Sequence, residues 1–173
     1  PSAMPIPVPT ADQRDAIAAD FDGDGDMDVF IGLRGPGKSL YLQNDGRGVF
    51  TDVSATKLDM PATDAVGAAG AVVDGDGDVD VFIANFDIAT PDVLLRNNGG
   101  VLTADPAAVP ADGSADHNAA FGDLDGDGDM DLFVVAYGAD GAGHKQERVL
   151  INDGAGNFTD ETPARVTGNP AIF

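Results

Sequence analysis

The chain contains no cysteine and no tryptophan, and only nine of its 173 residues are lysine or arginine. The absence of cysteine excludes disulfide bonds and thiolate metal sites. The few basic residues are scattered, which argues against nucleic-acid binding because phosphate contacts need a local surplus of positive charge. No run of 18 apolar residues occurs, so the sequence predicts no membrane-spanning helix.

Negative charge is abundant, with 30 acidic residues and a formal net charge of −21 at pH 7. All but two of the acidic residues are aspartate, the exceptions being Glu147 and Glu161. Aspartate suits tight loops, whereas glutamate suits helices. The charge alternates with apolar segments, and an apolar content of 43% is enough for the core of one domain. The composition therefore predicts a folded, loop-rich acidic domain.

Three segments, spaced 52 and 51 residues apart, place an aspartate at every second position of a glycine-containing loop. Each loop leads directly into a β-branched and aromatic segment. So many neighbouring carboxylates destabilise one another unless a cation joins them. We therefore expect the loops to bind metal. The candidate ligands are Asp20, Asp22, Asp24, Asp26, Asp28, Asp74, Asp76, Asp78, Asp80, Asp123, Asp125, Asp127, Asp129 and Asp131.

The spacing of the first and third loops predicts the geometry of a metal site. Oxygens at positions 1, 3, 5, 7 and 9 converge if the backbone turns sharply at position 6, which is Gly25 in the first loop and Gly128 in the third. We expect side-chain donors at positions 1, 3, 5 and 9 and a backbone carbonyl at position 7. An all-oxygen set on a flexible loop favours Ca²⁺ over Mg²⁺, and the lack of cysteine or nearby histidine argues against zinc.

The second loop differs because Val72 occupies position 1. We expect this third calcium site to be weaker, with water completing its shell. An EF-hand is excluded, since its position 12 would fall on Ile31 or Val134, each inside a predicted strand. The alternative for any single loop is a solvated acidic turn without metal.

Each loop lies within a unit that reads as four antiparallel strands, typical of one β-propeller blade. We expect an N-terminal segment at 1–11, blades at 12–63, 64–114 and 115–165, and a C-terminal strand or the start of a truncated blade at 166–173. A β-sandwich of roughly twelve strands is the alternative. The expected strands are Ala16–Ala19, Val29–Ile31, Leu40–Leu42, Phe50–Val53, Ala68–Val73, Val81–Ala84, Val93–Leu95, Leu102–Ala104, Asn118–Gly122, Leu132–Ala136, Val149–Ile151 and Phe158–Asp160. No helical period is found.

The unit resembles the FG-GAP or VCBS repeat, and residues 122–133 and 152–160 carry the likeness most clearly. In that family, an Asp-x-Asp-x-Asp-Gly-x-x-Asp loop binds calcium in integrin α-subunit propellers and in many bacterial secreted and surface proteins. The resemblance extends from about Asp12 to Arg165. It implies a propeller with calcium between the first and second strands of each blade, and an extracellular or cell-surface location.

Three blades are too few to close a propeller, which typically has four to eight. We expect either a fragment of a longer protein or a homo-oligomer, of which a two-fold dimer would have six blades.

The expected function is a calcium-stabilised scaffold or protein-interaction module. A calcium-dependent lectin is the alternative, although sugars are often held on aromatic faces and the chain has only Tyr41, Tyr137 and its phenylalanines. A polysaccharide lyase or hydrolase ranks lower, because the chain lacks a Gly-x-Ser-x-Gly motif and its paired carboxylates are assigned to metal. No catalytic residue is predicted, and His117 and His144 are expected to be surface or loop residues.

Overall fold

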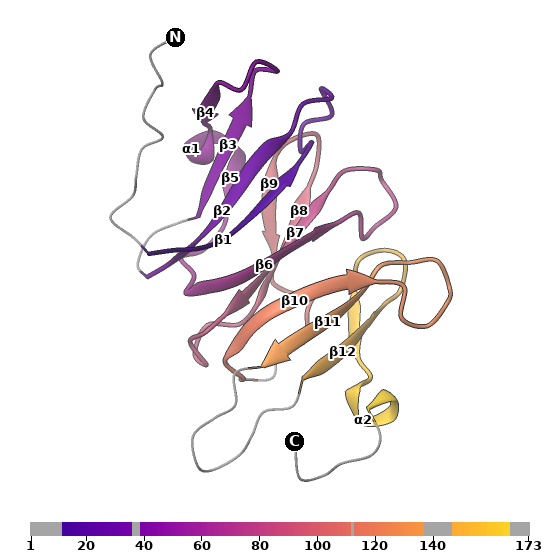
Figure 1. The fold of residues 1–173 in the computed structure, drawn as a ribbon. Helices are drawn as coiled ribbons and strands as arrows, with labels where there is room; N and C mark the ends of the chain where they lie inside the picture. The colour runs from indigo at the N-terminus through magenta and orange to yellow at the C-terminus, as the bar shows by residue number, and fades with distance from the viewer. Residues whose placement is uncertain (1–11, 36–38, 112, 137–146, 167–173) are drawn as a thin grey trace.

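The structure is a computed structural model that describes residues 12–35, 39–111, 113–136 and 147–166. These residues form three sheets and two single-turn helices (Figure 1). In this part of the chain, no helix has the length and apolar character needed to cross a membrane. The predicted all-β class is confirmed, and the division into three sheets, one for each repeat, differs from a two-layer sandwich.

Each sheet is built mainly from antiparallel strands in chain order. The first sheet contains β1 (Asp12–Ala19), β2 (Asp28–Arg34), β3 (Leu40–Asn44) and β4 (Phe50–Asp52). The second contains β6 (Ala65–Ala71), β7 (Asp80–Asn85), β8 (Val93–Asn97), β9 (Leu102–Asp105) and β5 (Leu58–Asp59). The third contains β10 (Asp116–Gly122), β11 (Asp131–Ala136), β12 (Arg148–Asn152) and β13 (Phe158–Asp160).

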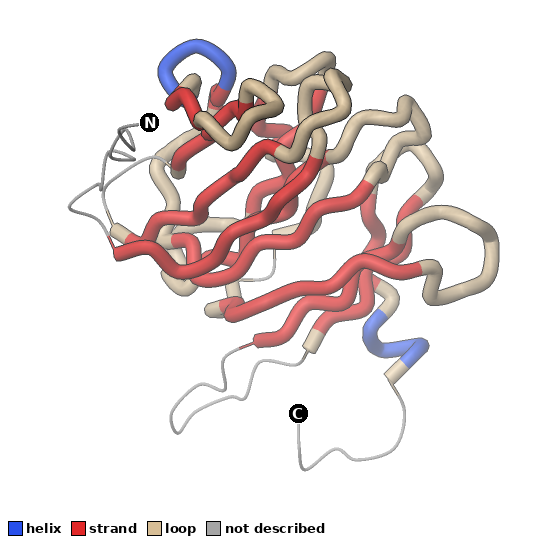
Figure 2. Tube along the Cα trace, turned by 45° about the horizontal axis from the view of Figure 1, so that its top comes forward, coloured by secondary structure: helices blue, strands red, loops and turns tan. Residues whose placement is uncertain are grey.

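The first strands of the three sheets lie side by side, with β6 between β1 and β10 (Figures 1 and 2). The amide of Ala68 on β6 donates to Asp15 Oδ2 on β1 at 3.1 Å. On the other side, a Cβ at Gly67 would lie 2.5 Å from the carbonyl oxygen of His117, so only glycine lets β6 and β10 approach this closely. The sheets thus spread outward from adjacent inner strands, as propeller blades do.

Alternating side chains of the middle sheet build two cores. Val81 and Ile83 on β7 pack with Phe30 and Tyr41 of the first sheet. The intervening Phe82 packs instead with apolar residues of the third sheet such as Leu132. Because successive strand residues point to opposite faces, one fully buried strand supplies both cores.

Two features differ from the sequence-based expectation. β5 follows the first unit in the chain but pairs in parallel with β9 of the second sheet. The chain also forms α1 (Ser54–Lys57) and α2 (Thr162–Arg165), whereas no helix was predicted. A single turn is too short to show a helical period.

Three expectations concern chain segments outside the described residues. They concern the N-terminal segment 1–11, nearly all of the C-terminal segment 166–173, and the residues Tyr137 and His144.

Candidate metal centres

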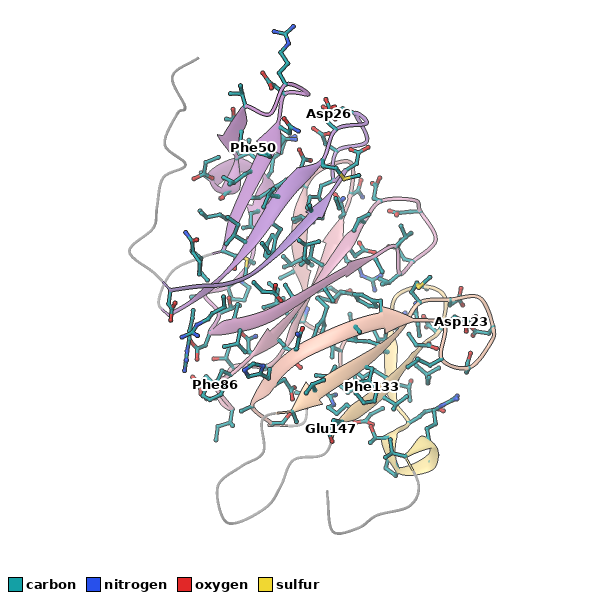
Figure 3. All side chains as sticks on the ribbon, in the orientation of Figure 1. Asp26, Phe50, Phe86, Asp123, Phe133 and Glu147 are labelled. Atoms are coloured by element: carbon teal, nitrogen blue, oxygen red, sulfur yellow. The ribbon has the colours of Figure 1, made fainter. Side chains whose placement is uncertain are left out.

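The three aspartate loops follow the first strand of each sheet and lie at the same end of the molecule. They connect β1 to β2, β6 to β7 and β10 to β11. Figure 3 shows Asp26 in the first loop and Asp123 in the third on the same side of the sheets, with Phe86 and Glu147 at the opposite ends of the strands. The repeated topology therefore brings three acidic loops to one face.

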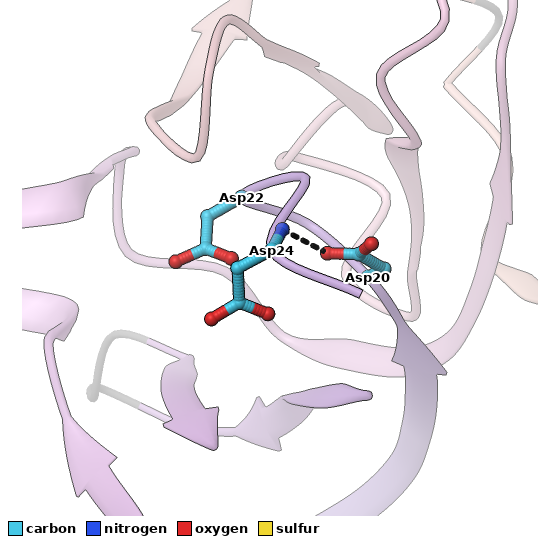
Figure 4. A group of neighbouring side chains, drawn as sticks. All are labelled: Asp20, Asp22 and Asp24. Atoms are coloured by element: carbon cyan, nitrogen blue, oxygen red, sulfur yellow. Dashed lines mark hydrogen bonds between the residues drawn. The ribbon is translucent and has the colours of Figure 1, made fainter. Parts of the chain in front are cut away.

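The first loop brings Asp20, Asp22 and Asp24 together, with one carboxylate oxygen of each within 4.8 Å of the others (Figure 4). Backbone amides hold Asp20 in place: Gly23 N and Asp24 N donate to Oδ1 at 2.8 and 3.1 Å, and Gly25 N donates to Oδ2 at 2.9 Å. Gly25 has a φ of 94°, as the predicted bend requires.

Asp22 carries the clearest sign that this loop fits a cation. Its Oδ2 accepts a hydrogen bond from Gln43 Nε2. Its Oδ1 is buried and has no hydrogen-bond donor among the described residues. A buried carboxylate oxygen without a partner is costly, and a metal ion at the cluster would satisfy it. The donor set, three carboxylates and no nitrogen or sulfur, suits calcium.

The third loop gathers Asp123, Asp125 and Asp131 within the same 4.8 Å limit. Asp123 is held as Asp20 is, since Gly126 N donates to Oδ1 at 2.6 Å and Gly128 N to Oδ2 at 3.2 Å. Asp125 Oδ2 also lies 3.3 Å from Arg165 Nη2, which ties α2 to this loop. Asp127 is exposed and accepts from Asp129 N at 2.9 Å, outside the cluster.

The aspartates at position 9 begin the second strand of each sheet and are fully buried: Asp28, Asp80 and Asp131. Each carboxylate accepts one backbone amide from position 2 of its own loop and one from the asparagine that ends the third strand. Asp131 belongs to a cluster, whereas Asp28 does not. Position 9 therefore braces the loop against the neighbouring turn, a role that the sequence did not indicate.

The aspartates at position 7 point away from the loops and toward the turn after the third strand. A Cβ at Gly46 would meet Asp26 Oδ2, and a Cβ at Gly154 would meet Asp129 Oδ2. Asp78 Oδ2 accepts from Gly99 N at 2.7 Å. With the side chain engaged elsewhere, the backbone carbonyl is the group that position 7 can offer to a metal.

The second loop lacks a complete acidic cluster among the described residues, and the guanidinium of Arg96 lies beside it. Within the described residues, Asp74, Asp76, Asp78 and Asp80 form no group of three with converging oxygens. Arg96 Nη1 lies 3.4 Å from Asp74 Oδ2, and Arg96 Nε lies 3.3 Å from Asp105 Oδ2. The same guanidinium donates to the carbonyl oxygens of Ala155 and Gly156 in the third sheet, at 2.9 and 2.7 Å.

Asparagines at the end of the third strands link the first aspartate loop to the second sheet and the second loop to the third sheet. Asn97 Nδ2 donates to the carbonyl of Phe21 at 2.8 Å, and Asn152 Nδ2 donates to that of Val73 at 2.7 Å. The sequence did not indicate this contact between sheets. The recurrence of these asparagines at equivalent positions in three units was the signal that could have identified them.

Burial and mutual repulsion raise the proton affinity of several loop carboxylates. Burial, opposed in part by two backbone amides, raises the pKa of Asp80 to about 6. Burial also raises the pKa of Asp28, with the charges of Asp22 and Asp24 adding to the effect. Desolvation and the charges of four neighbouring aspartates raise the pKa of Asp129. Desolvation is the largest cause of each rise, and the repulsion between neighbouring carboxylates, which a bound cation would relieve, adds to it.

Comparison with known families identifies the repeat. The profile of the FG-GAP-like repeat matches residues 9–72 and 73–134, so that two matches cover most of the chain and include all three aspartate loops. No curated protein sequence matches the chain. The repeated strand and loop pattern, and the two matches that span it, establish that the chain belongs to the FG-GAP-like repeat family.

Proposed function

We propose that the chain is a calcium-stabilised, β-propeller-like module that acts as a scaffold for protein interaction outside the cell. Repeats of this family are typically non-enzymatic interaction modules. The observation that carries the calcium assignment is the cluster of Asp20, Asp22 and Asp24, in which a buried carboxylate oxygen has no hydrogen-bond donor among the described residues.

Calcium would act through folding in this proposal. Calcium binds the assembled loops far better than the unfolded chain, so free metal stabilises the folded state by mass action. Asp20, Asp22 and Asp24 would hold one ion, and Asp123, Asp125 and Asp131 a second. Each cluster has exposed members, Asp24 in the first loop and Asp123 and Asp125 in the third, so both sites are open to metal from solution.

Thermal unfolding with and without calcium tests the proposal. We expect excess EDTA to lower the melting temperature clearly, and added CaCl₂ to restore it in a concentration-dependent way. MgCl₂ at the same ionic strength serves as the control for charge screening, and we expect it to restore less. Identical melting curves in EDTA and in calcium would refute the calcium sites.

We also propose that the three sheets complete a ring by pairing with a second copy of the chain. Phe133 and Val135 lie on the face of the third sheet that is turned away from the second, and Val135 is 39% exposed. The equivalent residue of the second sheet, Phe82, is fully buried against the third sheet. Val29 and Ile31, on the outer face of the first sheet, are only half-buried. Joining these two faces would repeat the packing that already holds the sheets together.

A further inference from the structure

A second polar cluster lies at the end of the sheets opposite the aspartate loops. Asp92 comes just before β8, Asp116 begins β10 and Arg148 begins β12. Their side chains are 5%, 2% and 4% exposed. Figure 3 labels Glu147, next to Arg148, at this end of the third sheet. The three residues come from distant parts of the sequence, and the fold brings them together.

Each of the two carboxylates has one oxygen fixed by the protein and one directed toward the other charged groups. Asn85 N donates to Asp92 Oδ1 at 2.9 Å, and Ser114 Oγ donates to Asp116 Oδ1 at 2.9 Å. The second oxygens face Arg148 Nη1, at 3.7 Å for Asp92 Oδ2 and 4.0 Å for Asp116 Oδ2. Both distances fit ion pairs but are longer than a hydrogen bond.

Asp92 Oδ2 is buried and accepts no hydrogen bond from the described residues. Arg148 is shared with a third acid, since its Nε lies 3.4 Å from Asp160 Oδ2. Among the described residues, one guanidinium therefore faces three carboxylates, and this group has an excess of negative charge. An ionised carboxylate oxygen buried in such a place calls for a donor, which a proton or a bound cation can supply.

The cluster forms one wall of a pocket of about 80 Å³. Its lining also includes the apolar residues Ile88, Pro91 and Ala111, of which Ile88 is 67% exposed. The pocket thus combines buried charged groups with apolar side chains. Its volume suits a small group rather than a whole sugar ring.

We propose that this pocket binds a primary alkylammonium group, with the ammonium between Asp92 Oδ2 and Asp116 Oδ2 and the alkyl chain against Ile88 and Pro91. An ammonium is a compact charge with three donors, so it can bridge single oxygens of two different carboxylates. Its methylene stem gains from apolar walls.

Other cations fit the pocket less well. A guanidinium binds best when both oxygens of one carboxylate are available, and here each carboxylate has one oxygen already bound. A divalent metal would meet twice the repulsion from Arg148, which already faces both free oxygens.

The surroundings of Asp92 in the cluster favour its protonation when no cation is bound. Burial, together with the neighbouring Asp116, raises the pKa of Asp92 to about 9, although Asn85 N and Arg148 oppose the shift. This direction favours the protonated form of Asp92 when no cation is bound. An ammonium ion that takes this place releases the proton to the buffer, so binding exchanges one positive charge for another.

Isothermal titration calorimetry of the calcium-loaded chain with n-butylammonium chloride tests the proposal. We expect saturable binding of one amine per chain. Titrations in HEPES and in Tris, whose ionisation enthalpies differ, should show the release of about one proton per amine bound at neutral pH. The neutral isostere n-butanol should not bind. The absence of saturable binding, or equal binding of n-butanol, would overturn the proposal.

Variants locate the site. We expect Asp92→Asn to weaken n-butylammonium binding at least tenfold. An amide cannot lose a proton and therefore offers the ammonium no negative charge. Asp87→Asn, in the same loop and exposed, should leave binding unchanged. Equal weakening by both variants would show non-specific attraction to an acidic surface and overturn the site. Asp92→Asn should keep the calcium-dependent melting shift, so this test is independent of the metal loops.

A second ligand distinguishes the lysine side chain of a partner protein from a free amine. Nα-acetyl-lysine N-methylamide carries the same ammonium group on a peptide backbone. Binding of both ligands with the same dependence on Asp92 assigns the pocket to lysine side chains of a partner protein, and binding of n-butylammonium alone assigns it to free amines.

Discussion

At the scale of single residues, Asp22 decides whether its loop is a metal site or a strained acidic turn. In the part of the chain that the structure describes, no donor reaches its buried Oδ1, and its neighbours Asp20 and Asp24 carry the same charge. Without metal, this carboxylate destabilises the loop by repulsion. With calcium, the same carboxylate supplies a ligand. The sign of its contribution to stability therefore depends on the metal.

Asp22→Asn should change the melting temperature in opposite directions in the two conditions. In EDTA we expect a higher melting temperature, because one of three clustered charges is gone. In calcium we expect a smaller metal-induced rise, with metal affinity reduced at least about tenfold. Asp59→Asn, an exposed aspartate in β5, removes one charge outside the loops and should leave the calcium-induced rise intact. A full calcium-induced rise in Asp22→Asn would contradict the assignment of this residue.

Asn152 is the residue whose loss should weaken the contact between sheets most directly. Its Nδ2 donates to Val73 O at 2.7 Å and Met130 O at 3.1 Å, and its Oδ1 accepts from Gly156 N at 2.9 Å. Asn152→Ala leaves these buried groups without partners, and we expect a loss of about 2 to 3 kcal/mol in the free energy of unfolding. Urea denaturation measures it. The exposed Asn98→Ala is the control and should change stability by less than about 0.5 kcal/mol.

At the scale of elements, the internal repeat predicted most of the strands and all three loops. Strand residues such as Val81 and Phe82 alternate between two cores, and this local pattern is readable from the chain. The pairing of β5 with β9 was not readable, because a two-residue strand has no pattern of its own. The cluster of Asp92, Asp116 and Arg148 was missed for a similar reason, since only the packing of the second and third sheets brings these residues together.

The second loop shows how a missing ligand and an added cation go together. Val72 cannot accept the amides that Asp20 accepts in the first loop, and Arg96 pairs with Asp74 where the first sheet has Gln43 bound to Asp22. Arg96 therefore replaces part of the charge that a metal would supply. The sequence predicted a weaker third site from Val72 alone, and Arg96 adds a physical reason for it.

The double variant Val72→Asp with Arg96→Gln should convert the second loop into a metal site like the first. We expect calcium stoichiometry, measured by equilibrium dialysis, to rise from two ions per chain to three. Arg96→Gln alone should keep two ions and lose stability, because Ala155 O and Gly156 O lose their donor. A double variant that still binds two ions would show that other features of the loop prevent binding.

At the scale of the whole molecule, the outer faces of the first and third sheets are less buried than the faces between sheets. The faces inside the molecule bury residues such as Phe30 and Phe82 completely, while Val135 on the outer face of the third sheet is 39% exposed. The outer face of the third sheet carries the same kinds of apolar residues that are buried between sheets inside the molecule. Such a face favours association with the outer face of the first sheet of another copy. Two copies joined head to tail at both ends would give six sheets, within the range of closed propellers.

Size-exclusion chromatography with light scattering distinguishes the closed dimer from the single chain. In calcium we expect a mass of twice the 17.6 kDa chain. Phe133→Asp should give the mass of one chain, because a charge would be buried in the contact between copies. Val49→Asp, which changes an apolar residue 48% exposed in the turn between β3 and β4, should keep the dimer. A stable monomer in calcium at every concentration tested would rule out ring closure by a second copy.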